Sequence, residues 1–191
     1  MVEEIFKLFV RKLFYIHNRK KFSHLAINAV LDKLLRIDGK ENIIIRKNVD
    51  IQKSTWIAAV PLTNKNTCSL IVDEGCIIGN FNHIYATEFI HIEKNVLTAD
   101  KVYIADNSHS FDNIDIPIMH QGIRQLPKVK IGEGSWIGEN VCIIGASVGR
   151  NSVIGANSVV TKDIPDYCVA VGSPARVVKK YNFMTKKWEK V

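Results

Sequence analysis

Histidine changes its charge near neutral pH, and one of the six histidines of this chain has an unusual setting. His109 stands in Ser108-His109-Ser-Phe111, at the start of a stretch, residues 110–128, that contains two prolines and no repeat. Long excursions from a compact fold are usually functional or disordered, and the apolar residues of this stretch favour an ordered arm. We therefore take His109 as the candidate general base and expect the other histidines to be structural: His17, His24, His83, His91 and His120.

The four cysteines offer nucleophilic chemistry, but their settings do not favour it. They form no CxxC pair, each has apolar neighbours, and none has an obvious histidine partner. We expect small buried thiols in a reducing compartment at Cys68, Cys76, Cys142 and Cys168.

The segment that must position His109 has a period of six residues, which begins after Gly39. Its order is aliphatic, Gly, any, Gly or Asn, small, any. The clearest copies start at Ile131, Ile137, Val148 and Ile154, and looser copies start at Ile45, Ile51, Val72, Ile78, Ile92 and Thr98. Such regular repetition indicates stacked structural repeats.

Each position of the six-residue repeat has a physical role. A branched aliphatic side chain at the first position can point into a narrow interior and stack on its equivalent one coil away. The fourth position needs a residue that tolerates a positive φ at a corner, and it holds Asn48, Gly75, Asn95, Gly134, Asn140, Asn151 and Asn157. Three strands and three corners make a triangular coil of about eighteen residues, and the chain supplies roughly five to six coils.

Three motifs add to this pattern. They are Asn80-Phe-Asn82, Ser108-His109-Ser-Phe111, and a C-terminal run from Trp136-Ile-Gly through Ile154-Gly-Ala156 and Val160-Thr161-Lys162-Asp-Ile-Pro165 to Gly172-Ser-Pro-Ala-Arg176. Together with the coils they make residues 41–178 resemble the hexapeptide-repeat acyltransferases, in particular sugar O-acetyltransferases of the capsule and O-antigen type and galactoside and maltose acetyltransferases. The resemblance implies a mainly β fold, a left-handed parallel β-helix with a protruding loop at about 110–128.

The resemblance also implies a reaction and a site. His109 would be the catalytic base that removes the proton of an acceptor hydroxyl as it attacks the thioester of acetyl-CoA, with no metal involved. The coenzyme A contacts would be Trp136, Ala156, Thr161, Lys162 and Arg176, and the acceptor contacts would be Asn80 and Asn82. Family members form homotrimers with sites between subunits, and the 110–128 arm would cover a neighbour's site.

Several of these roles have an alternative. One of the two asparagines could be only a corner residue, Trp136 could pack under the loop, and Lys162 could be a solvated turn lysine. Asp112 or Asp115 could orient the imidazole of His109, or either could be a plain loop acid.

The sequence departs from the family pattern in three places. The coil has five residues instead of six between Ile143 and Ser147, so one corner must be tightened. Many relatives have Asp-His-x-His where this chain has Asp106-Asn-Ser-His109. Residue 179 is lysine where several relatives have arginine, which keeps the charge but loses a bidentate fork.

The ends of the chain lack the six-residue period. Apolar residues at roughly helical spacing predict an amphipathic helical segment over residues 1–40, which either packs on the main domain or docks on a membrane surface. Residues 179–191 read as a basic tail. Residues 1–40 hold nine Lys or Arg against four Asp or Glu, a surplus of five positive charges. Such a surplus suits phosphates or an anionic membrane. No zinc finger, RNP sequence or dense arginine run favours nucleic acid.

No stretch approaches the roughly 18 apolar residues that span a bilayer, and Glu3 and Glu4 do not suit a signal peptide. These features predict a cytoplasmic protein, with membrane contact only at the inner face. The function that the family resemblance implies is O-acetylation of a sugar in surface polysaccharide biosynthesis, and the alternative is N-acetylation of an amino sugar nucleotide. A zinc enzyme on the same fold would need a closely spaced pair of histidines, which this chain does not have. A non-catalytic scaffold is disfavoured because it would not need all of these motifs together.

Overall fold

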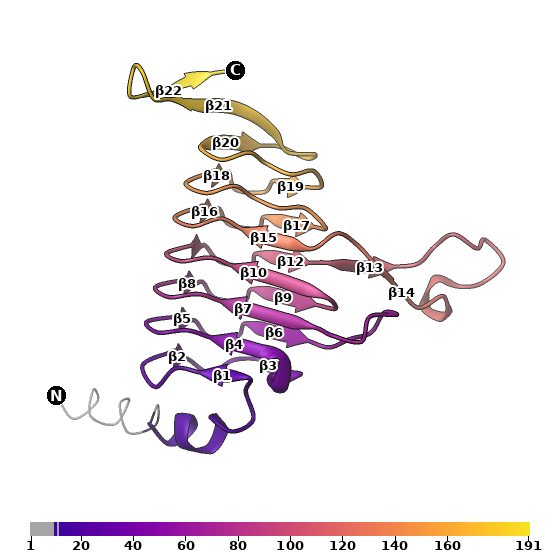
Figure 1. The fold of residues 1–191 in the computed structure, drawn as a ribbon. Helices are drawn as coiled ribbons and strands as arrows, with labels where there is room; N and C mark the ends of the chain where they lie inside the picture. Colours follow the sequence, from indigo (N-terminus) through magenta and orange to yellow (C-terminus); the bar gives the residue numbers. More distant parts are fainter. Residues whose placement is uncertain (1–9, 11) are drawn as a thin grey trace.

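The computed structural model describes residue 10 and residues 12–191 and has the shape of a three-sided column (Figure 1). Parallel strands stack on each side, and corners of a few residues join the sides. Sheet A contains β1 (His24–Leu25), β4 (Ile43–Ile45), β7 (Ser69–Val72), β10 (Phe89–Ile92) and β15 (Val129–Ile131). Single bridges at Val148 and Ile164 continue this side of the column.

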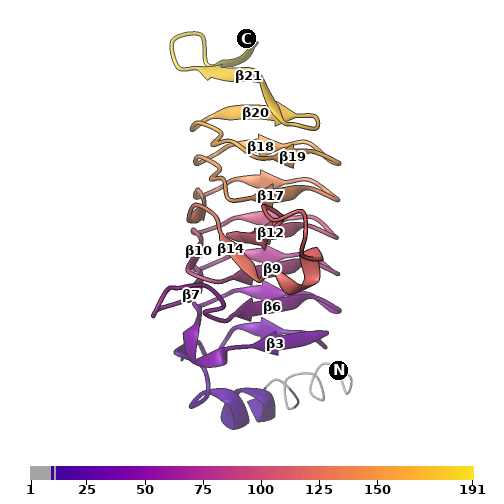
Figure 2. The same cartoon turned by 90° about the vertical axis from the view of Figure 1, so that its right-hand side faces the viewer.

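The other two sides follow the same rule. Sheet B contains β2 (Val30–Leu31), β5 (Asp50–Ile51), β8 (Ile77–Ile78), β11 (Leu97–Thr98), β16 (Trp136–Ile137), β18 (Val153–Ile154) and β20 (Cys168–Val171). Sheet C contains β3 (Arg36–Asp38), β6 (Trp56–Ala59), β9 (His83–Ala86), β12 (Tyr103–Ala105), β17 (Cys142–Ile144) and β19 (Val159–Val160). Figure 2 faces the side on which the sheet C strands are stacked. Below, the edge where two sheets meet takes both letters, as in the C/A edge.

The predicted aliphatic positions form the core. Ile131, Ile137 and Ile154, which start the clearest repeats, are fully buried. The largest fully buried side chains are all isoleucine or leucine, in register from coil to coil. Burial of one such side chain stabilises the fold by about 1.5–3 kcal/mol, and the core runs along the column without interruption.

The predicted corners are confirmed. Every glycine and asparagine expected at a fourth position has a positive φ, from 47° at Asn151 to 76° at Gly75. Gly145, in the coil that is one residue short, also has a positive φ of 56°. A left-handed residue reverses the chain within a short corner, which accounts for the choice of Gly and Asn.

The prediction of helix over residues 1–40 is wrong for most of its described part. Helical residues are found at 10 and 12–18, and residues 24–38 form β1, β2 and β3, the first coil of the column. The predicted helical positions Ile5 and Phe9 lie outside the described residues. Phe14 and Tyr15 pack against the core, whereas Leu13 and Ile16 are exposed. Among the described residues, no helix has the length and apolar character needed to cross a membrane.

Several segments depart from the regular coils of the column. An arm leaves it between β12 and β15 and contains β13 (Asn107–His109), the 3-10 turn η2 (Ile118–His120) and β14 (Ile123–Gln125), with β13 and β14 antiparallel (Figure 1). A second 3-10 turn, η1 (Lys40–Asn42), precedes β4. At the C-terminal end β21 (Arg176–Asn182) and β22 (Lys187–Lys190) form an antiparallel hairpin on β20, so the predicted basic tail is a folded hairpin.

Candidate active site

The structure places His109 at the root of the arm. Sheet C strand β12 ends at Ala105, Asp106 follows, and β13 carries His109 away from the column at the C/A edge. Alternation along β13 puts His109 on the same side of the arm as Asn107, whose amide donates to the carbonyl oxygen of Tyr85 at 3.0 Å. The His109 side chain itself is exposed.

Asp106 fixes the arm to the column. Its side chain is fully buried, and its carboxylate accepts hydrogen bonds from the backbone N–H groups of Thr87, Glu88 and Phe89 at 2.7–2.8 Å. The side chain of Gln125, on β14, donates to the Asp106 carbonyl oxygen at 2.7 Å. Both strands of the arm are thus tied to the coil that ends before His109.

No acid orients His109 within the described part of the chain. Asp112 forms an ion pair with Arg124 at 3.3 Å, and the guanidinium of Arg124 lies 4.7 Å from the centre of the Phe111 ring. The carboxylate of Asp115 contacts no imidazole in the described part of the chain, and the backbone N–H of Asp115 donates to the Asn113 side chain. The arm is internally ordered by Gln121, which donates to the carbonyl oxygens of Asn113 and Ile116.

The tip of the arm is apolar and faces solvent in a single chain. The exposed fractions are 61% for Phe111, 95% for Ile114, 54% for Ile118 and 78% for Met119. Contiguous exposed apolar surface of this kind marks an interaction site.

The predicted coenzyme A residues lie at the C-terminal coils. Thr161 and Lys162 follow β19 at the C/A edge, the same edge as His109 and two strand spacings away, roughly 10 Å along the column. Ala156 follows β18 at the opposite edge of sheet C, the B/C edge, and Arg176 begins β21. Thr161, Lys162, Ala156 and Arg176 are all exposed. Gly138 lies beside Ala156, since a Cβ on Gly138 would stand 2.7 Å from the Ala156 nitrogen.

Trp136 is on a different side of the molecule. It projects from sheet B, is 50% exposed, and stands in register with Leu97 on one side and Val153 on the other. Ile77 continues the row. We name Ile77, Leu97, Trp136 and Val153 the sheet B column.

Asn80 and Asn82 sit at the B/C edge. The Asn80 amide donates to Gln52 at 3.0 Å and to Asp100 at 3.1 Å and is half-buried. Asn82 is 1% exposed; its amide donates to Thr98 at 2.7 Å and accepts from the Val102 N–H. Asn82 therefore forms part of the corner, which leaves Asn80 as the better placed of the two for an acceptor.

One chain does not bring all the predicted residues together. The B/C and C/A edges of a coil are separated by about five residues of strand, roughly 17 Å. Asn80 and Ala156 lie at one edge, His109 and Lys162 at the other, and Trp136 on a third surface. A site that uses all of them needs a second copy of the chain.

The expectation of small buried thiols is confirmed for Cys68, Cys76 and Cys168 and is wrong for Cys142, which is half-buried on the outer face of sheet C because it occupies an outward position of β17. Burial raises the pKa of Cys68 to about 12, with a smaller contribution from the charge of Asp106, and burial raises the pKa of Cys76 to about 11. Burial also raises the pKa of Cys168. These thiols are protonated at neutral pH, so they are poor nucleophiles.

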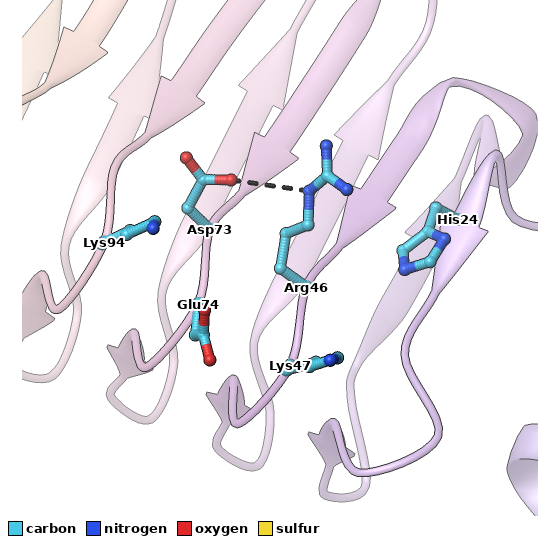
Figure 3. Close-up of a pocket in the computed structure, with 6 residues that line it drawn as sticks. All are labelled: His24, Arg46, Lys47, Asp73, Glu74 and Lys94. Atoms are coloured by element: carbon cyan, nitrogen blue, oxygen red, sulfur yellow. Dashed lines mark ion pairs between the residues drawn. The ribbon is translucent and has the colours of Figure 1, made fainter.

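A polar pocket of about 460 Å³ lies away from His109, at the A/B edge (Figure 3). Arg46 and Asp73 point toward each other across it and form an ion pair at 3.6 Å. Lys47, Glu74, Lys94 and His24 complete its lining. Its charges largely compensate one another, and it belongs to the stacking of corners rather than to the His109 site.

Two features of the site were not singled out from the sequence. Asp106 stood out in the sequence only as part of a motif, yet it anchors the arm. The sequence feature that could have identified it is an acidic residue directly after a buried strand and directly before a non-repeating segment. The outer face of sheet C carries Trp56, His83, Tyr85 and Tyr103, which alternate with buried residues on β6, β9 and β12. That alternation is visible in the sequence once the strands are known.

Comparison with known proteins agrees with the fold. Residues 128–162 match the family model described as the hexapeptide repeat of succinyl-transferase. The galactoside O-acetyltransferase of Escherichia coli is 37% identical over 152 residues, which cover 76% of this chain and 70% of that protein. The chain belongs to the hexapeptide-repeat acetyltransferase family.

Two other relatives are longer than the region they share. A Mycobacterium tuberculosis protein named as an acetyltransferase is 38% identical over 77% of this chain and 55% of its own length. The protein named as the lipopolysaccharide biosynthesis O-acetyl transferase WbbJ of Escherichia coli is 41% identical over 59% of this chain and 61% of its own length. The chain thus spans little more than half of these two relatives.

Solved structures share the architecture. AntD, an N-acyltransferase from Bacillus cereus in complex with dTDP and 3-hydroxybutyryl-CoA, superposes with a TM-score of 0.73 at 18% identity over 90% of both chains. A hexapeptide-repeat acetyltransferase from Vibrio cholerae, complexed with acetyl-CoA, has a TM-score of 0.57 at 21% identity over 92% of this chain and 86% of that one. The column is the left-handed β-helix that the sequence predicted.

Proposed function

We propose that this protein transfers an acetyl group from acetyl-CoA to a hydroxyl group of a sugar, with His109 as the general base. The observation that carries the proposal is that an exposed imidazole stands at the root of an ordered arm, on the same edge of the column as Thr161 and Lys162. The relatives named as sugar O-acetyltransferases support the choice of acceptor.

The reaction follows from these positions. The acceptor oxygen attacks the thioester carbonyl carbon while the Nε2 or Nδ1 of His109 takes the hydroxyl proton. The C–S bond then breaks, the acetyl group stays on the sugar oxygen, and the proton goes to the sulfur of coenzyme A. Cys68, Cys76 and Cys168 have raised pKa values and are therefore poor nucleophiles, which supports direct transfer without a covalent intermediate on these residues.

We further propose that the active form is a homotrimer with sites between subunits. The site residues lie on three surfaces of one chain, and two exposed apolar features need cover: the arm tip and the sheet B column. The arm of one copy would then lie over the neighbour's donor residues.

The test is release of the coenzyme A thiol from acetyl-CoA in the presence of a panel of glycans, amino sugars and nucleotide sugars. We expect His109→Ala to lower kcat by about 10²- to 10⁴-fold with little effect on folding, the usual contribution of a positioned base. His24→Ala, which removes an exposed histidine from β1 of sheet A, away from the arm, is the matched control and should keep wild-type kcat. Retention of more than about a tenth of the turnover by His109→Ala would contradict the assignment.

A further inference from the structure

The outer face of sheet C carries a row of aromatic rings in register. Trp56, His83 and Tyr103 are direct neighbours on β6, β9 and β12. The rings of Trp56 and His83 stack with centres 4.1 Å apart and an interplanar angle of 9°, and the centres of His83 and Tyr103 are 5.3 Å apart. Tyr85, two residues after His83, lies 5.7 Å from Trp56 between ring centres. We name Trp56, His83, Tyr85 and Tyr103 the aromatic ladder.

Polar groups accompany these rings. The Arg36 guanidinium lies 4.9 Å from the centre of the Trp56 ring and pairs with Asp38 at 2.7 Å, and Asp38 accepts the Trp56 indole N–H at 2.8 Å. His83 Nε2 is buried and has no hydrogen-bond partner within the described part of the chain. A buried imidazole nitrogen without a partner is uncommon, because desolvation of a polar atom costs free energy unless something bonds to it.

One hydrogen bond connects the strand that carries the ladder residue Tyr85 to the arm that carries His109. The carbonyl oxygen of Tyr85 holds the Asn107 amide, two residues before the candidate base, so the ladder ends beside the root of the arm. Beyond Tyr103 the same row continues through Cys142 and Val159, next to Thr161 and Lys162. Along sheet C, β12 carries the last ring of the ladder and is followed by β13 with His109, and β19, which precedes Thr161 and Lys162, lies two strand positions further toward the C-terminal end of the column.

We propose that the aromatic ladder binds the sugar rings of the acceptor, an inference that rests on the proposed function. The C–H groups on one face of a sugar ring pack against aromatic rings, while its hydroxyls need donors and acceptors at the rim. The ladder supplies the rings, and Arg36, Asp38 and the tyrosine hydroxyls supply the polar partners. An acceptor held there presents a hydroxyl to His109 from the side opposite the donor.

A second copy of the chain is the other occupant that this face could have, and its chemistry favours the sugar. The core of a protein interface is depleted in charged residues, whereas Trp56 carries a charged pair directly on its ring and its N–H. The sheet B column, aliphatic apart from Trp136, is the better interface with another copy. Those two surfaces lie on different sides of the column.

The direct test is a sugar-binding measurement. Saturation-transfer NMR detects the binding, and the probes are methyl β-galactoside, methyl α-glucoside, lactose and maltose. We expect at least one probe to bind wild type, and Trp56→Ala and Tyr103→Ala each to weaken it by about tenfold. Trp188→Ala, which removes the same ring type from the C-terminal hairpin, is the matched control and should bind as wild type does. Thermal melting monitored by circular dichroism selects the variants that fold.

Three results would overturn the proposal: no probe binds to wild type, the folded ladder variants bind as well as wild type, or they lose their oligomeric state in light scattering. Saturation transferred to the thymine ring of dTDP but not to any sugar would also overturn it, since the ladder would then bind a nucleobase.

The acetyl-transfer assay separates this proposal from the function. If wild type binds sugars through the ladder but releases no coenzyme A, the proposed activity fails and the ladder stands. If wild type transfers acetyl groups and Trp56→Ala keeps its KM for the sugar, the ladder fails and the activity stands. The expected result is a raised KM for the sugar with an unchanged KM for acetyl-CoA.

Discussion

Exposed cations at the C-terminal coils have the chemistry to hold the phosphates of coenzyme A. Lys162 follows β19 and Arg176 begins β21, and the Arg176 guanidinium donates to the Ala175 carbonyl oxygen at 3.0 Å. We expect Lys162→Ala and Arg176→Ala each to weaken acetyl-CoA by about 1 to 2 kcal/mol, less so in high salt, because each removes a charge-assisted contact. Isothermal titration calorimetry measures the affinities.

Dephospho-coenzyme A identifies which residue meets the 3′-phosphate. Wild type should bind it more weakly than coenzyme A, and the variant that has lost the phosphate partner should bind both alike. If both variants still discriminate as wild type does, the phosphate is held elsewhere, for example by Lys179.

The buried thiol of Cys76 links stability to alkaline pH. Its pKa is raised from 9.0 to about 11 by burial, so the folded state keeps the proton that the unfolded state releases. The stability that this gives is complete below pH 9.0 and is lost as the pH rises to about 11. We expect the urea unfolding free energy of wild type to fall by up to about 3 kcal/mol more over this range than that of Cys76→Ala.

Cys142→Ala, which removes a half-buried cysteine from the outer face of sheet C, is the matched control for this measurement. It should lose stability with pH as wild type does. Parallel pH profiles for wild type and Cys76→Ala would show that the thiol makes no such contribution.

At the residue scale, sequence could predict positions but not partners. His109 was predicted from its place before a non-repeating segment, and the structure puts it at the arm root. Asn82 belongs to the same three-residue motif as Asn80, but its amide is used up by Thr98 and Val102, sixteen and twenty residues away. A contact between coils depends on stacking register, which no single repeat reveals.

Among the elements, the arm depends on one buried carboxylate. Asp106→Asn replaces one of the two carboxylate oxygens with an NH2 group, which cannot accept, so buried backbone donors among residues 87–89 lose a partner. We expect the unfolding free energy to fall by about 2 to 4 kcal/mol and kcat to fall with it, since the arm root carries His109. Urea denaturation and the thiol-release assay measure the two effects.

Asp112→Asn removes a carboxylate from the exposed ion pair with Arg124 in the same arm. It should cost less than about 1 kcal/mol. Equal losses in the two variants would mean that Asp106 is not the anchor of the arm.

The predicted coils are confirmed wherever the corner residues were distinctive. The first coil was missed, because residues 1–40 were predicted to be helical. Leu25, Leu31, Ile37 and Ile43 are spaced by six, and Asn28 occupies the fourth position, where it bonds to Asn48 of the next coil at 2.6 Å. Leu25, Val30 and Leu34 are also compatible with a helix. The second position of this coil lacks glycine, so local spacing alone could not separate the two structures; stacking on the next coil decides for strands.

For the whole molecule, the sheet B column makes assembly testable. Leu97 is 43% exposed between Ile77 and Trp136, so Leu97→Arg places a charge in the middle of an apolar row. We expect wild type to scatter light as a trimer, three times 21.6 kDa, and Leu97→Arg to dissociate and lose activity.

Ile44→Arg introduces the same charge on the outer face of sheet A and should leave the trimer intact. A wild type that is active as a stable monomer of 21.6 kDa would refute the assembly.

The C-terminal hairpin affects whether further coils can add to the end of the column. A stack of parallel strands is a template: each end offers open backbone groups to the next coil, whether from its own chain or from another. Here β21 covers β20 in the antiparallel direction, and β22, with Lys187 and Lys190, forms the outer rim. At the other end Phe14 and Tyr15 close the core. The C-terminal end of sheet B is closed by an antiparallel pair of strands, which disfavours the addition of a further parallel coil on this side.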